Sequence, residues 1–289
     1  HTHTHTMSNT QSVVRTDGRE YNHLRKLACE LSLLDAADGS AKYSAGGTLV
    51  VAAVFGPVAV RASEEEVNDA VISVSFRPRA GRPTAPQHVE LETYVASALS
   101  SVVLTSLYPR TGINVVLQAI ADDGSLLSAC INAAVLALVD AGIEMTALMA
   151  SVSIAYLSVV PAAKPGPDGD SAVEVDDDAR TAARRSLVLL DPRTCESLPS
   201  AARRAADADA DADVVHLDNV EVESAVVVTI GVSDAAIATP AVEFVRTYGE
   251  LAPATLDSLL RMALVSAKSV LSFMKLTFAA NVRKRQALS

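Results

Sequence analysis

Residues 126–139, LLSACINAAVLALV, strongly restrict the fold of this chain, because they contain no charged side chain and follow directly on a Gly-Ser pair. Apolar residues repeat there at helical spacing, and Gly142 follows as a candidate C-cap. Directly before them, Gly124 and Ser125 stand where backbone N–H groups at a helix N-terminus can cradle a phosphate. The sequence therefore predicts a buried helix that begins at a phosphate site, at the remnant of one, or at an ordinary cap.

The segments around this helix predict an α+β fold of mixed sheets, with βαβ units packed by helices. β-Branched runs separated by Gly and Pro turn signals predict strands over residues 17–63, and alternation predicts another over 69–81. Apolar residues from Leu91 to Val103 predict a helix that ends before Pro109. Further strands are expected over 112–121, 147–160, 186–192 and 223–232. A long helix is expected over 252–285, as core or subunit interface.

Residues 1–7, HTHTHTM, have the composition of an expression tag with a start Met, and we expect residues 8–289 to form one domain. Acidic, loop-like inserts are expected at about 161–185 and 193–220. The Ala-Asp alternation in the second insert has two interpretations, a cation site or a solvated acidic linker, and like-charge runs favour the linker.

Composition excludes several classes of function. The net charge of −10 makes the chain a poor general binder of nucleic acid, so contact with RNA would need local basic patches or partner subunits. No apolar run reaches the roughly 18 residues of a membrane span, and we expect no membrane partner. The three cysteines are unclustered and the histidines lack ligand spacing, so we expect a reduced compartment, no metal and no cofactor.

Several ordered motifs resemble one family. They are Asp-Gly-Arg, Leu-Arg, Ala-Asp-Gly-Ser-Ala, Gly-x-Thr and Gly-Pro within residues 17–60, followed by LYPRTGINVVLQ (107–118) and GSLLSACINAAVLALVDAGIEM (124–145). Together they resemble the RNase PH family, and most closely the ring subunit of the eukaryotic RNA exosome of the component five type. The resemblance implies an RNase PH-like fold, six-membered rings around an RNA channel, and, in active members, phosphorolysis of RNA 3′ ends.

The resemblance also implies where a phosphorolytic site would lie. Active members carry a Thr-Arg pair after a glycine at the start of the central helix, and the matching positions here are Leu126 and Leu127. Leucine supplies neither the charge nor the donors that phosphate needs. A second family arginine matches a position near Gln87 and His88. Asp122 and Asp123 would repel an anion and satisfy the helix dipole themselves. We interpret Asp123, Gly124, Ser125, Leu126 and Leu127 as a degenerate remnant.

Two further sets of residues are candidates. The family's catalytic carboxylates lie before a Val-rich strand, which places one near Glu223 and the other near Leu217 or Asp218; a solvated acidic loop is the competing interpretation. A weak RNA-binding cluster is formed by Arg77, Arg79 and Arg82, with Arg110 similar in character. An ordinary salt-bridged loop explains these arginines equally well.

We therefore predict a non-catalytic RNase PH-like ring subunit that scaffolds RNA processing and degradation, including that of rRNA, and helps to line the channel. An active phosphate-dependent 3′→5′ exoribonuclease is the alternative. The expected partners are other RNase PH-like exosome subunits, cap subunits and RNA, and the isolated chain could form a homodimer. The expected localisation is the nucleus, nucleolus and cytoplasm.

Overall fold

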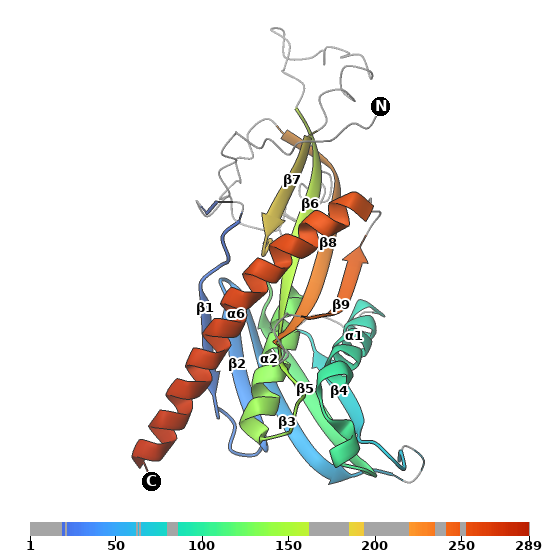
Figure 1. The fold of residues 1–289 in the computed structure, drawn as a ribbon, viewed down its shortest axis with the longest axis vertical. Coiled ribbons are helices and arrows are strands. Elements are labelled where there is room, and N and C mark those ends of the chain that lie inside the picture. The colour runs from blue at the N-terminus through green and yellow to red at the C-terminus, as the bar shows by residue number, and fades with distance from the viewer. Residues whose placement is uncertain are drawn as a thin grey trace.

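The computed structural model describes residues 19–20, 22–61, 63, 65–79, 86–161, 185–193, 220–234, 241–248 and 253–288. The acidic stretches 162–184 and 194–219 lie outside the described residues. The described elements build two sheets and three long helices (Figure 1). The strands are β1 (Leu27–Leu31), β2 (Gly39–Ala45), β3 (Thr48–Ala59), β4 (Val71–Arg77), β5 (Thr111–Ala121), β6 (Leu148–Pro161), β7 (Arg185–Leu190), β8 (Val220–Asp234) and β9 (Ala241–Tyr248). The long helices are α1 (Pro86–Val102), α2 (Leu126–Ala141) and α6 (Pro253–Leu288).

The first sheet has five strands in the order β1-β2-β3-β5-β4. Its pairs are antiparallel except for β4 and β5, which run parallel with Val71 opposite Gly112 and Arg77 opposite Gln118. A parallel pair needs a crossover, and α1 provides it. This βαβ unit places the beginnings of α1 and α2 at the same edge of the sheet, beyond the carboxyl ends of β4 and β5.

The second sheet is antiparallel, in the order β7-β6-β8-β9. β6 lies between β7 and β8, with Ile154 opposite both Leu190 and Val228. Its edge strand β9 was not expected from the sequence, because the short segment AVEFVRTY alternates only weakly. The expected strands at 112–121, 147–160, 186–192 and 223–232 correspond to β5, β6, β7 and β8, with shifted ends.

α2 lies between the two sheets and forms the centre of the core. It packs on β2 and β3 of the first sheet and on β6 of the second. All residues from Leu127 to Leu138 are buried. The polar member of this run, Asn132, is satisfied because its side chain exchanges hydrogen bonds of 2.7 and 2.9 Å with the backbone of Ser151. Gly142 ends the helix in the left-handed conformation, as expected.

α6 crosses the second sheet diagonally and continues past β1, so that its C-terminal end projects from the body (Figure 1). Among the described helices, α6 has the length and apolar composition that a membrane crossing requires, a test that core helices also pass. Its inner side joins the hydrophobic core through Leu259, Ala263, Ala267, Val270, Leu271 and Met274. These contacts agree with the expectation of a core helix. Near the far end, Arg285 pairs with Asp140 at 2.6 Å and so ties α6 to the last turn of α2.

Candidate functional site: the start of α2

The turn before α2, residues 122–125, is called the cradle, because the sequence resembles a phosphate-binding turn at this place. Gly124 has φ 90° and Ser125 has φ 55°, and the helix begins at Leu126. The Ser125 side chain does not cap the helix; its hydroxyl donates to the carbonyl of Pro192 at 3.0 Å. The Gly124 N–H donates to Asp122 Oδ1 at 3.1 Å. The start of α2 is therefore tied to the chain that leaves β7, and the idea of an ordinary side-chain cap is wrong.

The two leucines at this turn belong to the core. Leu127 is 8% exposed, and Leu126 is partly buried against the same cluster. No acidic side chain occupies the first turn of the helix. Neither of the two positions that match the family's Thr-Arg pair therefore offers a charge or a donor to an anion.

A buried arginine lies directly beneath the turn. Arg25, 5% exposed, donates from Nε and Nη2 to the two carboxylate oxygens of Asp191 at 2.9 and 2.6 Å. Its Nη1 also donates to the carbonyl of Asp123 at 2.9 Å, and its Nη2 to that of Gly124 at 3.2 Å. These hydrogen bonds use all three nitrogens of the guanidinium as donors. Arg25 thus donates to the backbone carbonyls of the turn and makes no hydrogen bond with its N–H groups.

Thr48 completes the support of this turn. Its hydroxyl donates to the Gly124 carbonyl at 2.7 Å and accepts from the Asp123 N–H at 3.0 Å. The tight β2–β3 turn brings Thr48 here, and a Cβ on Gly47 would lie 2.8 Å from Asp123 Oδ2. Gly47 is therefore favoured by the close approach of this turn to Asp123, whereas Gly46 has φ 57° and a Cβ there would lie 2.6 Å from Arg25 Cδ.

Asp123 has side-chain partners that the sequence did not predict. Its carboxylate accepts from Arg193 Nε at 2.9 Å and lies 3.8 Å from Arg25 Nη1. Two guanidinium groups therefore lie against it, so its charge is compensated by side chains as well as by the start of the helix. Asp122 is exposed and bonds the Gly124 N–H. The cradle is held by an internal network of Arg25, Asp191, Asp123 and Arg193.

Glu223 lies in β8, and its backbone is distant from the start of α2. In the pairing of β6 with β8, Ser158 lies opposite Ser224 and Val159 lies opposite Val222. Glu223 therefore has no partner of its own at this irregularity in the register. The cradle adjoins β6 at Ser153, whose carbonyl accepts from the N–H of Asp191. Five residues along a strand span roughly 17 Å. The structure therefore does not bring the Glu223 backbone to the start of α2, and Leu217 and Asp218 lie outside the described residues.

The basic candidates fall at two ends of one sheet. Arg77 ends β4 and Arg79 follows it, both exposed, at the edge where α1 and α2 begin. Arg110 precedes β5 at the opposite edge and lies 3.5 Å from Glu65. Because β4 and β5 are parallel, six residues of strand, or about 20 Å, separate these edges. Arg82 lies outside the described residues.

His88 was the nearest cation expected for the second family arginine. It lies in the first turn of α1, and its ring packs on Phe76 at a centroid distance of 5.2 Å. Gln87 beside it is exposed. The packing of His88 against the end of β4 is a structural contact.

The sequence reasoning missed the roles of Arg25, Asp191 and Thr48. Arg25 had been noted only as part of a Leu-Arg motif. A charged residue beside a half-buried strand and an aspartate that ends an apolar strand, SLVLLDP, are the signals that could have suggested a buried pair. Their 166-residue separation concealed it.

Most residues of this site lie in a segment that is similar to a known protein family. Residues 23–144 match the RNase PH family, described as the 3′ exoribonuclease family, domain 1. These residues are therefore similar to domain 1 of the RNase PH family. The matched region contains Arg25, Thr48, Asp123 and the whole of α2. Asp191 and Arg193, which complete the network, come from the chain beyond it.

Curated relatives of two exosome types match the first half of the chain. The RRP41 homologue of Arabidopsis thaliana is 36% identical over 157 residues, which cover 51% of this chain and 65% of the relative. The RRP46 homologue of the same plant, an exosome complex exonuclease by name, is 40% identical over 138 residues, which cover 48% and 57%. The chain thus spans less than two thirds of either relative.

Solved structures match over a greater length. Rice (Oryza sativa) Rrp46 superposes with a TM-score of 0.66 at 26% identity, covering 91% of this chain and 99% of that one. An archaeal exosome core superposes at 0.57 with 20% identity, covering 90% of each chain. The RNase PH-like fold expected from the sequence is therefore confirmed, and it includes the second sheet and α6.

Proposed function

We propose that this chain is a ring subunit of the RNA exosome core, of the RRP46 type, and that it does not itself catalyse phosphorolysis. Membership in the ring is supported by the RRP41 and RRP46 relatives and by the superposition on exosome core structures. The RRP46 type is supported by the 40% identity and by the TM-score of 0.66 to rice Rrp46.

The observation that supports the loss of catalysis is the position of Leu126 and Leu127. Inorganic phosphate carries about two negative charges near neutral pH, and its binding in a protein normally uses cationic forked donors. Here the two matching side chains pack into the core. The nearest guanidinium groups, Arg25 and Arg193, are committed to Asp191 and Asp123. The subunit would then act as a scaffold that holds its neighbours and guides RNA toward nucleases elsewhere.

A phosphorolysis assay tests this proposal. The purified full chain is incubated with a 3′-tailed RNA, Mg²⁺ and inorganic phosphate, and nucleoside diphosphates are measured. We expect none above a control without phosphate. Phosphate-dependent release of nucleoside diphosphates by the isolated chain would overturn the proposal. A second arm repeats the assay with an assembled ring, since release there and not in the isolated chain would assign activity to a shared site.

Exposed apolar side chains support contacts with neighbouring subunits. Val242 and Val245 on the edge strand β9 are exposed, as are Val89 and Tyr94 on α1 beside it. An open strand edge with such side chains is suited to pairing with another subunit. RNase PH-like exosome subunits and cap subunits are the partners we propose, and the isolated chain would form a homodimer through the same surface. Light scattering that finds a strict monomer at high concentration would contradict self-association.

Arg77 and Arg79 are the residues we propose to touch RNA. They are exposed at the edge where both helices begin, and phosphate contacts need only exposed cationic side chains. We further propose that the subunit resides in the nucleus, nucleolus and cytoplasm. Imaging of a fluorescent fusion tests this, and confinement to one of these compartments would contradict it.

A further inference from the structure

α6 carries many more basic than acidic residues. Asp257 is the sole acidic residue of this 36-residue helix, which also carries Arg261, Lys268, Lys275, Arg283, Lys284 and Arg285. The whole chain has a net charge of −10, so this helix is basic within an acidic protein. Arg261 pairs with Asp257, and Lys275 pairs with Asp234. Lys268 is exposed, and no carboxylate among the described residues pairs with it.

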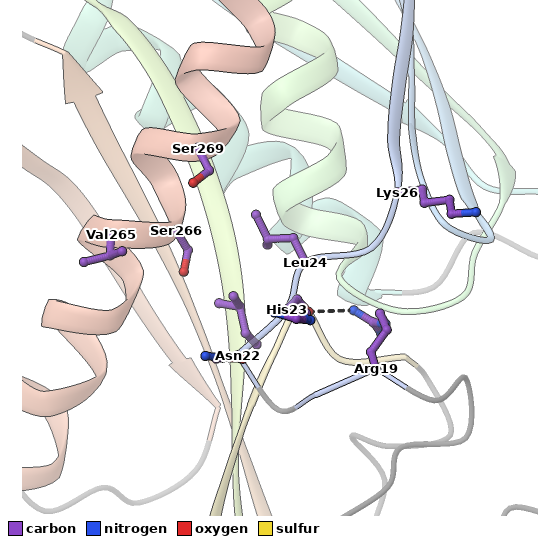
Figure 2. A pocket seen from close by; sticks show the side chains of 9 residues that line it. Arg19, Asn22, His23, Leu24, Lys26, Val265, Ser266 and Ser269 are labelled. Carbon is purple, nitrogen blue, oxygen red and sulfur yellow. Dashed lines mark hydrogen bonds between the residues drawn. The ribbon is translucent and has the colours of Figure 1, made fainter.

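A groove of about 470 Å³ runs between α6 and the segment that leads into β1 (Figure 2). Val265, Ser266 and Ser269 face it from α6, and Leu24, His23 and Arg19 come from the N-terminal segment. None of the described residues that line it is acidic, although Glu20 lies 3.8 Å from the His23 ring. The described lining residues are Arg19, Asn22, His23, Leu24, Lys26, Leu190, Val265, Ser266 and Ser269.

The groove combines apolar and cationic side chains. Leu24, Leu190 and Val265 supply apolar surface, and Val265 is 69% exposed, which is unusual for a valine on a core helix. Lys26 and Arg19 supply positive charge along the N-terminal side, and Arg19 also donates to the carbonyl of His23 at 2.9 Å. Lys268 is exposed on α6 next to Ser269 in the sequence, outside the described lining of the groove. A ligand suited to this groove must therefore bring both carboxylates and apolar side chains.

We propose that this groove binds an acidic segment of a partner protein in which Asp or Glu alternates with apolar residues. Successive side chains of an extended peptide point to opposite sides. Each wall of the groove offers apolar surface, Leu24 on the N-terminal segment and Val265 on α6, so apolar side chains on either side of such a peptide would be covered. Its carboxylates would lie near Lys26, with Lys268 close to the rim on α6. Peptide-binding sites commonly combine pockets for apolar side chains with charged residues at their edges.

The same groove is poorly suited to RNA. Single-stranded nucleic acid is usually held by aromatic side chains that stack on bases, and none of the described residues that line this groove is Phe, Tyr or Trp. With so few cations, phosphate neutralisation would give only weak, salt-sensitive binding. The apolar side chains would also remain uncovered.

Fluorescence anisotropy with the full chain tests the proposal. The probe is a labelled synthetic peptide that alternates Asp and Leu, compared with the same peptide carrying Asn in place of Asp. We expect binding of the Asp peptide, and a loss of at least about tenfold with the Asn peptide, with Lys26→Glu and with Val265→Asp, because each removes one half of the recognition. Lys284→Glu is the matched control, since it makes the same charge change on α6 roughly 24 Å from Lys268.

Circular dichroism checks that each variant is folded before binding is compared. Equal affinity of the wild type, Lys26→Glu and Val265→Asp for the Asp peptide would overturn the proposal. Failure of the wild type to bind at roughly 100 μM peptide would do so as well. A labelled oligouridine that binds more tightly than the peptide, and loses affinity with the same variants, would assign the groove to nucleic acid instead.

Discussion

Arg25 and Asp191 form a forked ion pair beneath the start of α2, with Nη2–Oδ1 and Nε–Oδ2 distances of 2.6 and 2.9 Å and both residues 5% exposed. The backbone N–H of Arg25 adds a third bond to Asp191. The pair joins the N-terminal segment to the end of β7. Through the carbonyls of Asp123 and Gly124, it also fixes the turn that in an active relative would face phosphate. The candidate site is therefore a strongly connected part of this fold.

Arg25→Ala should destabilise the protein by about 3–5 kcal/mol, because it leaves the Asp191 carboxylate buried without its partner. Urea denaturation followed by circular dichroism measures the change. Lys42→Ala is the matched control: its pair with Glu30, at 3.2 Å, is largely exposed, and its loss should cost at most about 1 kcal/mol. Equal effects of the two substitutions would contradict the importance of burial. The double variant Arg25→Met/Asp191→Leu should lose less than the sum of the single changes.

Restoring the family's side chains should not restore catalysis. Leu126→Thr/Leu127→Arg recreates the Thr-Arg pair, but Leu127 is 8% exposed and packs in the core. An arginine there either buries a charge or displaces the first turn of α2, so we expect a loss of stability of more than roughly 3 kcal/mol and no phosphorolysis. Leu126→Thr alone, at a partly exposed position, should cost much less.

The phosphorolysis assay and a urea titration are run on all three proteins. Phosphate-dependent nucleoside diphosphate release by the double variant would show that Leu126 and Leu127 were the sole obstacle. Equal stability of the double variant and Leu126→Thr would contradict the burial argument.

The sequence predicts the regular elements well where their pattern is strong. The apolar residues from Leu126 to Val139 repeat at helical spacing, and this run forms the helix between the sheets. β9 was missed because its side chains alternate weakly, and pairing with β8 decides its conformation. The local sequence pattern was therefore sufficient to predict α2 and insufficient to predict the edge strand β9.

The site was harder to predict than the fold. That Leu126 and Leu127 cannot bind an anion follows from their chemistry alone. The environment of Asp123 does not, because its partners Arg25 and Arg193 come from distant parts of the chain. Charge counting near a helix N-terminus thus gave an incomplete account of Asp123, since only the folded chain reveals that two guanidinium groups lie against it.

The two described cysteines should differ sharply in reactivity. Cys130 is fully buried in α2, and burial raises the pKa of its thiol. Burial also raises the pKa of the half-buried Cys29, and a hydrogen bond with Thr277 partly offsets that rise. A raised pKa leaves less thiolate near neutral pH, so both react more slowly than a free cysteine, and the rate at Cys29 should keep increasing above pH 9.

Iodoacetamide labelling followed by mass spectrometry checks this, in a Cys195→Ser background that removes the third thiol. We expect slow labelling of Cys29 and labelling of Cys130 only in urea. Thr277→Val should slow Cys29 further, because it removes the bond that lowers its pKa. Faster labelling of Cys29 in Thr277→Val would contradict this reasoning.

Gly39 marks the closest approach of β2 to α2. A Cβ at this position would lie 2.3 Å from the backbone nitrogen of Ala141 and 2.4 Å from the carbonyl of Ala137. Gly39→Ala must therefore push the last turn of α2 away from the sheet, and we expect a loss of about 2–3 kcal/mol in urea denaturation. Gly142→Ala separates this clash from backbone strain: Gly142 has φ 73° and open space around it, so the cost there should stay near 1 kcal/mol. If Gly39→Ala proved as mild as Gly142→Ala, the contact between β2 and α2 would be looser than these distances require.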